Sequence, residues 1–312
     1  MLHIGNYLGA VKGFLALQDD PMYETFYMVA DLHALTTPYD KDTLAASTRN
    51  VIKDYLAAGL DPEKSTLFVQ SMVPEHVELA YYFSTVTTMA KMMHLPTYKE
   101  KVKLYPDNST MALLNYPVLM AADILVYKAG LVPVGIDQEP HLEVARGIAR
   151  RMNADFSTDF PEPQRFATKG ENVPSLTGEG KMSKSVEGSF IALTDDLQTI
   201  QNKLAKAPTD AGGPGDPAKA SQPVQNLFKF LYLFLPDRHA YFADLYRDGK
   251  LRYKELKDEL SRAIYEEIRP MQERRAKLTD DYVDQVIADG AKKARIVASQ
   301  TVREVKEKMG LL

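Results

Sequence analysis

The chain has 312 residues, of which 45% are hydrophobic and 26% are charged, so it can bury one large core or two unequal ones. It contains no cysteine, which excludes disulfides, thiolate zinc sites, cysteine nucleophiles and iron–sulfur clusters. A formal net charge of −4 argues against indiscriminate coating of nucleic acid but allows a local basic face for a folded RNA. Because no apolar stretch approaches the ~20 residues of a membrane span and no secretion signal is visible, we expect a cytoplasmic protein without membrane association.

The first half of the chain alternates between strand and helix patterns. Residues 25–30 and 65–70 are short apolar runs typical of buried parallel strands, and residues 40–60 between them have helical spacing. A further strand pattern at 131–134 lies between helical patterns at 116–127 and 139–152. This alternation predicts an α/β fold with a doubly wound parallel sheet, in which ligands bind beyond the carboxyl ends of the strands.

The character of the chain changes after about residue 186. Residues 205–223 are rich in Gly, Pro and Asp and predict an exposed connection. Beyond it, 224–235, 254–267 and 281–309 show helical periodicity with charged outer positions. We therefore predict two domains, 1–187 with the sheet and 188–312 helical, with the last helix packing back on the first domain.

The sequence His3-Ile4-Gly5-Asn6 precedes an amphipathic stretch at 7–18. If Gly5 and Asn6 open that helix, their backbone N–H groups and the helix dipole point at an anion, and the side chains of His3 and Asn6 add donors. The pattern predicts a phosphate-binding corner. Taken alone, a histidine near an N-terminus is more often an exposed polar residue.

A second cluster of polar residues, Lys181-Met182-Ser183-Lys184-Ser185, follows the glycine-containing stretch 177–180. Two ammonium groups and two hydroxyls on a loop are suited to a triphosphate, because positioned cations stabilise the charge that grows when an adenylyl group is transferred. The alternative is a solvated run of charges. The presence of the His3–Asn6 corner upstream makes that alternative the weaker one.

The apolar segment 116–123 contains a single carboxylate. Met120 and Asp123 are spaced i, i+3 and share one helix face. An apolar pocket with one acceptor suits an indole ring, whose N–H only donates. The alternative is that Asp123 pairs with a nearby basic residue.

A predicted strand end runs into a helix at 132–141. Asp137 is placed there to hold ribose hydroxyls, and Gln138 to accept from an α-ammonium group. Taken singly, such residues at a strand–helix junction are usually caps.

Together these segments resemble class I aminoacyl-tRNA synthetases, whose Rossmann-like nucleotide domain is followed by a helical domain. The two signatures are His3–Asn6 and Lys181–Ser185, while Met120–Asp123 and the turn at 132–138 resemble the tryptophanyl branch. The likeness covers nearly the whole chain, including 29–34, 98–101 and 269–274. It implies that residues 1–187 bind ATP and the amino acid and that residues 188–312 face tRNA.

The resemblance also implies a role for individual residues. For the reaction, these are Lys101, Lys181, Ser183 and Lys184; for ATP, they are His3, Gly5, Asn6, Gly135, Asp137, Lys181 and Lys184; for tryptophan, they are His33, Tyr116, Met120, Asp123 and Gln138. Tyr116 and Gln138 would bind the ammonium and carboxylate end, and Met120 and Asp123 would meet the indole. His33 would line the pocket, although a packed structural histidine is an equal alternative.

The implied activity has two steps: tryptophan and Mg²⁺-ATP form tryptophanyl-adenylate, and tRNA(Trp) then takes the tryptophanyl group. Mg²⁺ would be carried with ATP, without a structural metal in the protein. The resemblance further implies a homodimer, with tRNA crossing both subunits.

Two departures from the family pattern are visible. The family has a strand and turn before the His3–Asn6 signature, where this sequence has only Met1 and Leu2, so we expect the central first strand to be missing. Ile136 occupies a position that is commonly acidic, and we expect its side chain to point away from the site.

Two other functions compete with this interpretation. Tyrosyl-tRNA synthetase also uses an Asp on the equivalent helix, but a phenol both donates and accepts and needs a second polar side chain. The missing strand would instead favour a catalytically silent relative that binds tRNA. Six basic residues near the C-terminus could face RNA, although a solvated helix face is the more common arrangement: Lys292, Lys293, Arg295, Arg303, Lys306 and Lys308.

Overall fold

The computed structural model describes residues 2–167, 173–178, 180–182, 186–210 and 215–312. These residues form two compact units, which we call the first and second unit. The first unit comprises Met1–Lys12, Asp54–Gly59 and Lys169–Leu278, and the second comprises Gly13–Lys53, Leu60–Thr168 and Thr279–Leu312. The N-terminal residues belong to the same unit as the helices that follow residue 188.

The second unit contains both predicted strands and most of the helix between them. Strand β1 (Thr25–Val29) pairs in parallel with β2 (Ser65–Val69), with Thr25 opposite Ser65, and helix α4 (Lys41–Ala58) lies between them in sequence. The hydroxyls of Thr25 and Ser65 are 2.7 Å apart, so the two strands begin together. Helix α3 (Asp31–Ala34) follows β1 directly. The predictions for residues 25–30 and 65–70 are confirmed.

A second pair of parallel strands lies in the same unit. Strand β3 (Leu131–Val132) pairs with β4 (Gln164–Arg165), which the sequence patterns did not indicate. The described residues thus contain two small parallel sheets, and the fold is α/β.

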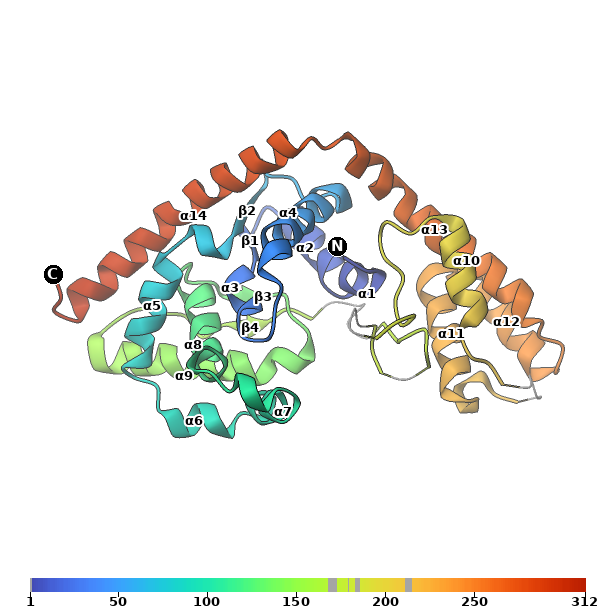
Figure 1. Ribbon diagram of the computed structural model, residues 1–312, viewed down its shortest axis with the longest axis horizontal. Coiled ribbons are helices and arrows are strands. Elements are labelled where there is room, and N and C mark those ends of the chain that lie inside the picture. The colour runs from blue at the N-terminus through green and yellow to red at the C-terminus, as the bar shows by residue number, and fades with distance from the viewer. Residues whose placement is uncertain (1, 168–172, 179, 183–185, 211–214) are drawn as a thin grey trace. The chain divides into compact units, whose positions relative to one another are not determined.

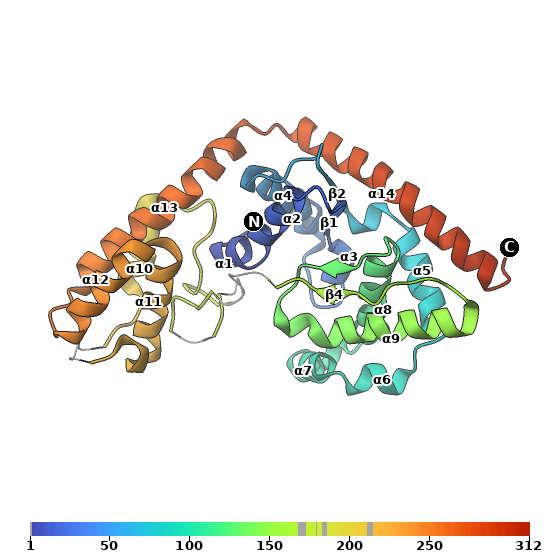
Figure 2. The ribbon, with the colours of Figure 1, turned by 180° about the vertical axis from the view of Figure 1, so that it is seen from behind.

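Helices surround these strands. Helix α8 (Met111–Leu125) packs against α5 (Glu75–Ser84) and against α9 (Glu139–Phe156), and Figure 2 shows α8 and α9 beside each other. Helix α8 begins five residues before the predicted 116, because Thr110 caps the backbone N–H of Leu113. The short helices α6 (Met89–His94) and α7 (Pro96–Leu104) connect α5 to α8. Fully buried side chains of α5, α8 and α9 form the core: Leu79, Phe83, Leu125, Leu142 and Met152.

The last helix, α14 (Asp280–Lys308), packs directly against β2 (Figure 1). At Gly290 a Cβ atom would lie 1.7 Å from the carbonyl oxygen of Leu67, so only glycine lets the helix come this close to the strand. The C-terminal helix therefore joins the unit that holds the strands.

The first unit is built mainly from helices that follow residue 196. They are α10 (Leu197–Lys206), α11 (Gln222–Phe234), α12 (Pro236–Arg247) and α13 (Tyr253–Lys277). Helices α11 and α13 confirm the predicted helical segments, although α13 continues through Pro270. The predicted connection at 205–223 overlaps the end of α10 and the start of α11, and between these helices its described residues are irregular apart from a 3₁₀ turn at Pro217–Lys219. Among the described residues, no helix combines the length and the apolar character needed to span a bilayer.

Candidate functional site

The N-terminal corner of the first unit is organised by His3. Helix α1 (Ile4–Asn6) continues through a π-helical turn, Tyr7–Val11, into α2 (Lys12–Gln18). His3 caps α1: its Nδ1 accepts from the backbone N–H of Asn6, and Asn6 Oδ1 accepts from the N–H of His3, both at 3.2 Å. The backbone N–H of Asn6, which we expected to face an anion, thus already has a partner within the corner.

The two signature segments touch each other. A Cβ atom at Gly5 would lie 2.9 Å from the ring of His3 and 3.4 Å from Cβ of Met182. Only glycine therefore fits between the His3 ring and the lysine-rich segment without displacing one of them. Lys181 is exposed beside a cavity of about 380 Å³ that it shares with residues of α11. Ser183 and Lys184 lie outside the described residues.

In the second unit, Asp123 is the centre of a hydrogen-bond network. Its Oδ2 accepts from Nε2 of His33 at 2.7 Å. Its Oδ1 accepts from Nε2 of Gln70 at 2.7 Å and from Nδ1 of His76 at 2.6 Å. Asp123 therefore does pair with basic residues, and the donors come from α3, from the segment after β2 and from α5.

The partners of Asp123 keep it ionised despite its burial, since its side chain is only 7% exposed. Burial alone would raise its pKa, but the hydrogen bonds from His33 and His76 outweigh burial and hold the pKa below its ordinary value. A buried carboxylate that stays ionised is an acceptor and not a donor.

Tyr116 stands at the centre of a second polar cluster in this unit. Its hydroxyl lies 2.7 Å from Nε2 of His141 and 2.9 Å from Oγ1 of Thr97. The ring of His33 meets that of Tyr116 edge-on at 6.1 Å between centroids, so the two clusters are neighbours. The Nζ of Lys101 lies 5.1 Å from the Tyr116 ring centroid, and burial lowers the pKa of Lys101.

The turn before α9 carries the remaining predicted residues. Gln138 Nε2 donates to Asp137 Oδ2 at 2.8 Å, and a Cβ at Gly135 would lie 2.6 Å from Asp137 Oδ1. The side chain of Ile136 is exposed to solvent. Met120 is half-buried on α8, one turn before Asp123.

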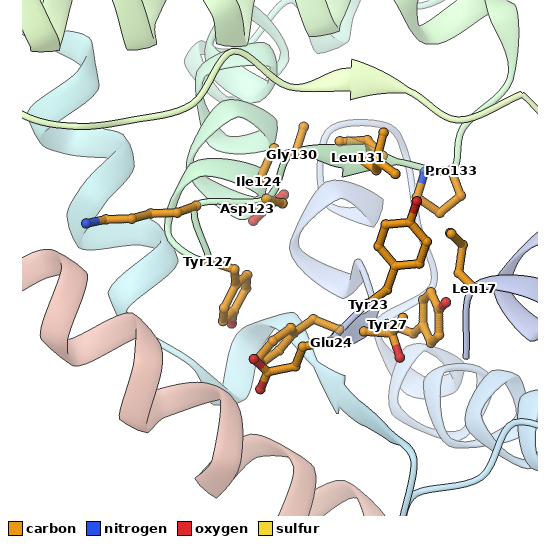
Figure 3. Close-up of a pocket in the computed structure, with 15 residues that line it drawn as sticks. Leu17, Tyr23, Glu24, Tyr27, Asp123, Ile124, Tyr127, Gly130, Leu131 and Pro133 are labelled. Carbon is orange, nitrogen blue, oxygen red and sulfur yellow. The ribbon is translucent and has the colours of Figure 1, made fainter. Parts of the chain in front are cut away.

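A cavity of about 370 Å³ lies between β1 and β3 (Figure 3). Leu17, Tyr23 and Tyr27 border it beside β1, and Leu131 and Pro133 border it at β3. Asp123 and Tyr127 also line it, so this groove adjoins the Asp123 network.

The comparisons with known proteins agree on one family. Residues 1–268 match the model for tRNA synthetases class I (W and Y). The tryptophan–tRNA ligase of Porphyromonas gingivalis is 41% identical over 315 residues, covering 99% of this chain and 95% of that protein. That of Helicobacter pylori is 36% identical over 315 residues, covering 100% and 95%.

The chain belongs to the tryptophan–tRNA ligase family.

Solved structures of this family share the fold. The tryptophanyl-tRNA synthetase of Mycoplasma pneumoniae superposes with a TM-score of 0.85 at 29% identity, covering 99% of this chain and 94% of that one. The Campylobacter jejuni synthetase, solved with ADP and tryptophan, gives a TM-score of 0.84 at 30% identity, covering 99% and 96%. The resemblance drawn from the sequence is thus confirmed at the level of the family and of the α/β fold.

Several residues that surround the predicted site residues Asp123 and Tyr116 were not predicted from the sequence. They are Gln70, His76 and Tyr127 around Asp123, and Thr97 and His141 around Tyr116. Each is an ordinary polar residue of a helix or loop in the sequence. Only Gln70 has a positional signal, since it directly follows a strand whose carboxyl end is expected at a ligand site.

Five of the six basic residues considered on α14 have protein partners. Among the six residues considered for RNA binding, Arg295 pairs with Glu75, Arg303 with Glu307 and Lys306 with Glu78, while Lys293 and Lys308 donate to backbone carbonyls. This arrangement favours an ordinary helix surface over an RNA-binding face.

The depressed pKa of Asp123 gives stability a pH dependence. The unfolded carboxyl titrates near ~3.9, so the contribution of ionised Asp123 is present above that pH and is lost as pH falls through the lower folded pKa. We expect Asp123→Asn to cost roughly 2–4 kcal/mol at neutral pH, and this difference from the wild type to shrink in acid. Urea unfolding of both proteins from about pH 7 to pH 3 measures it.

A matched control is Asp159→Asn. The pKa of Asp159 is also lowered, first by its hydrogen bond from Lys128, but its side chain is 66% exposed. Its substitution should cost less than about 1 kcal/mol. Equal costs at the two positions would contradict the structural role of Asp123.

Proposed function

We propose that this chain activates tryptophan with ATP and transfers it to tRNA(Trp). The observation that carries the proposal is the buried, ionised carboxylate of Asp123, which accepts a hydrogen bond from His33, whose ring in turn meets that of Tyr116 edge-on. Contact between the Gly5 and Met182 segments supports it, because the family's two nucleotide signatures meet there. Membership of the tryptophan–tRNA ligase family supports it independently.

The acceptor geometry suits an indole. Oδ1 of Asp123 already accepts two hydrogen bonds, whereas among the described residues Oδ2 accepts one, from His33. An oxygen of a carboxylate offers about two lone-pair directions, so Oδ2 retains one for a further donor. The indole N–H of tryptophan is such a donor.

The individual roles follow the family pattern. Tyr116 and Gln138 bind the ammonium and carboxylate end of tryptophan, while His33, Met120 and Asp123 bind its ring. ATP is bound by His3, Gly5, Asn6, Gly135 and Asp137, and its phosphates by Lys101, Lys181, Ser183 and Lys184. Residues 1–187 would form the catalytic part and residues 188–312 a tRNA-facing part. Mg²⁺ enters with ATP on its phosphates, as hard cations prefer oxygen ligands.

The reaction proceeds in two transfers. A carboxylate oxygen of tryptophan attacks the α-phosphorus of ATP, the bond to the β-phosphate bridging oxygen breaks, and pyrophosphate leaves. The terminal ribose hydroxyl of tRNA then attacks the tryptophanyl carbonyl, loses its proton and releases AMP. The protein contributes positioning and lysine charge rather than a covalent intermediate. This substrate implies a cytoplasmic location.

Pyrophosphate exchange tests the function. We expect exchange of labelled pyrophosphate into ATP to depend on tryptophan and to be at least ~100-fold less efficient with tyrosine, since the ionised carboxylate of Asp123 can accept from a phenol but offers no donor to its oxygen. Lys181→Ala should lower kcat by roughly 100-fold and change the KM for tryptophan little, because its charge stabilises the transition state. Lys229→Ala, beside the same cavity, is the control. More efficient exchange with tyrosine would overturn the assignment.

We also propose that a further parallel strand belongs between β1 and β3. The cavity there is lined along one side by Thr25, Phe26 and Tyr27 and along the other by Leu131 and Val132. A strand in this position would join the two small sheets into one Rossmann-like sheet and would satisfy the facing backbone edges. It corresponds to the strand that the family pattern has before His3.

The strand proposal predicts a gain in stability. Adding about ten residues of the family's first strand before Met1 should raise Tm by roughly 5 °C or more and raise the exchange rate, because the strand buries the apolar lining. An extension of equal length made of Gly and Ser is the control. Equal Tm values for the two extended proteins would refute the proposal.

We propose further that the protein is a homodimer through an apolar surface of α5, α6 and α8. Tyr81, Met89 and Met111 are 72%, 63% and 69% exposed and border one cavity of about 390 Å³. Large apolar side chains gathered on one exposed surface are typical of an interface, and a two-fold axis would let the same patch cover itself.

Sedimentation tests the dimer. Met111→Lys should shift the protein from dimer to monomer at micromolar concentrations, because it places charge in the apolar contact. Ile296→Lys is the matched control, since Ile296 is 67% exposed on α14 and does not border this cavity. A monomeric wild type, or equal dissociation by both variants, would contradict the proposal.

A further inference from the structure

The carboxylate of Asp123 is held asymmetrically. Gln70 and His76 both donate to Oδ1, and only His33 donates to Oδ2 among the described residues. The two donors on Oδ1 saturate that oxygen and fix the plane of the carboxylate. The lone pair of Asp123 that remains available to a further donor is therefore on Oδ2.

His76, like Gln70, is fully buried. Its side chain has no solvent exposure and lies in the first turn of α5. Its Nδ1 contacts Asp123, and its Nε2 lies 2.7 Å from the hydroxyl of Tyr127. When the neutral ring donates from Nδ1, Nε2 is the acceptor for the Tyr127 hydroxyl, so both ring nitrogens have partners in this one tautomer.

Tyr127 is itself fixed in place. Its ring stacks on Phe26 at 4.7 Å between centroids and meets Phe68 edge-on at 5.6 Å. Burial, together with the nearby charges of Asp123 and Glu75, raises the pKa of Tyr127, so its hydroxyl keeps the proton that it donates. The order of donation therefore runs from Tyr127 to His76 and from His76 to Asp123.

The order of donation has a chemical consequence for Asp123. Without the hydrogen bond from His76, the buried carboxylate loses a donor that favours its charged form. A protonated carboxyl donates a hydrogen bond, and a rotated carboxylate presents a different oxygen. Either change removes the acceptor that an indole N–H needs.

We propose that His76, with its tautomer set by Tyr127, is a positioning residue that determines selectivity for ligands with a ring N–H. It acts through Asp123 and does not touch the ligand. The proposal rests on the proposed function, since it names what makes the same pocket selective for tryptophan.

The test compares tryptophan with an isosteric analogue in which sulfur replaces the indole N–H. Binding of each by calorimetry gives a selectivity ratio. We expect His76→Leu to weaken tryptophan binding roughly tenfold or more and analogue binding less than about twofold, because hydrogen bonds to an ionised group are strong. In exchange assays, KM for tryptophan should rise while kcat changes little.

Two further variants isolate the hydrogen bond. His76→Asn places an amide N–H near the position of Nδ1 and should restore most of the selectivity, whereas His76→Gln places its amide near Nε2 and should not. Tyr127→Phe removes the hydroxyl that fixes the tautomer of His76. It should lower the ratio of tryptophan to analogue binding to an intermediate value, roughly threefold below wild type.

Leu79→Ala is the control for stability. Leu79 is fully buried on the same helix and makes no hydrogen bond from its side chain, so the variant should lower Tm while leaving the selectivity ratio unchanged. Parallel loss of tryptophan and analogue binding in His76→Leu, or a changed ratio in Leu79→Ala, would overturn the positioning role. A wild-type protein that binds neither compound would instead overturn the proposed function.

Discussion

A carboxylate that is removed from water is costly unless donors surround it, and this constraint organises the second unit around Asp123. Its partners arrive from three directions: His33 from the helix after β1, Gln70 from the turn after β2, and His76 from α5. The parallel pairing of β1 and β2 brings the first two to the same edge of the sheet. The strands, helices and polar network are thus parts of one arrangement.

The first unit has its own buried carboxylate, Asp54, with a side chain 1% exposed. It accepts from the backbone N–H of Leu2 at 2.6 Å and from Nε of Arg275 at 2.8 Å. The backbone N–H of Ile4 then donates to the carbonyl of Ile191 at 2.9 Å. These bonds hold the start of the chain beside Ile191 and keep Gly5 close to Met182.

The groove between β1 and β3 and the Asp123 network share residues. Phe26 and Tyr127 line the groove, and Tyr127 is also the last member of the hydrogen-bond chain through His76. The packing of the groove therefore bears on the orientation of the Tyr127 hydroxyl. Through this ring, the packing of the groove and the hydrogen bonds of Asp123 are physically connected.

Local patterns in the sequence were enough for the elements whose burial is periodic. The runs at 25–30 and 65–70 form strands, and 139–152 lies within α9, because an element that packs on one side repeats its apolar residues at a fixed spacing. The same patterns were insufficient for β4, which has two residues, and for the short helices between α5 and α8.

The sequence by itself determined the family and the two signature segments, since ordered runs such as His3–Asn6 and Lys181–Ser185 carry their information locally. Tertiary structure alone decided which residues hold Asp123 and Tyr116. Asp123 and His33 are 90 positions apart, and Asp123 and His76 are 47 apart. No spacing rule joins residues so distant, because their contact depends on how whole strands and helices pack.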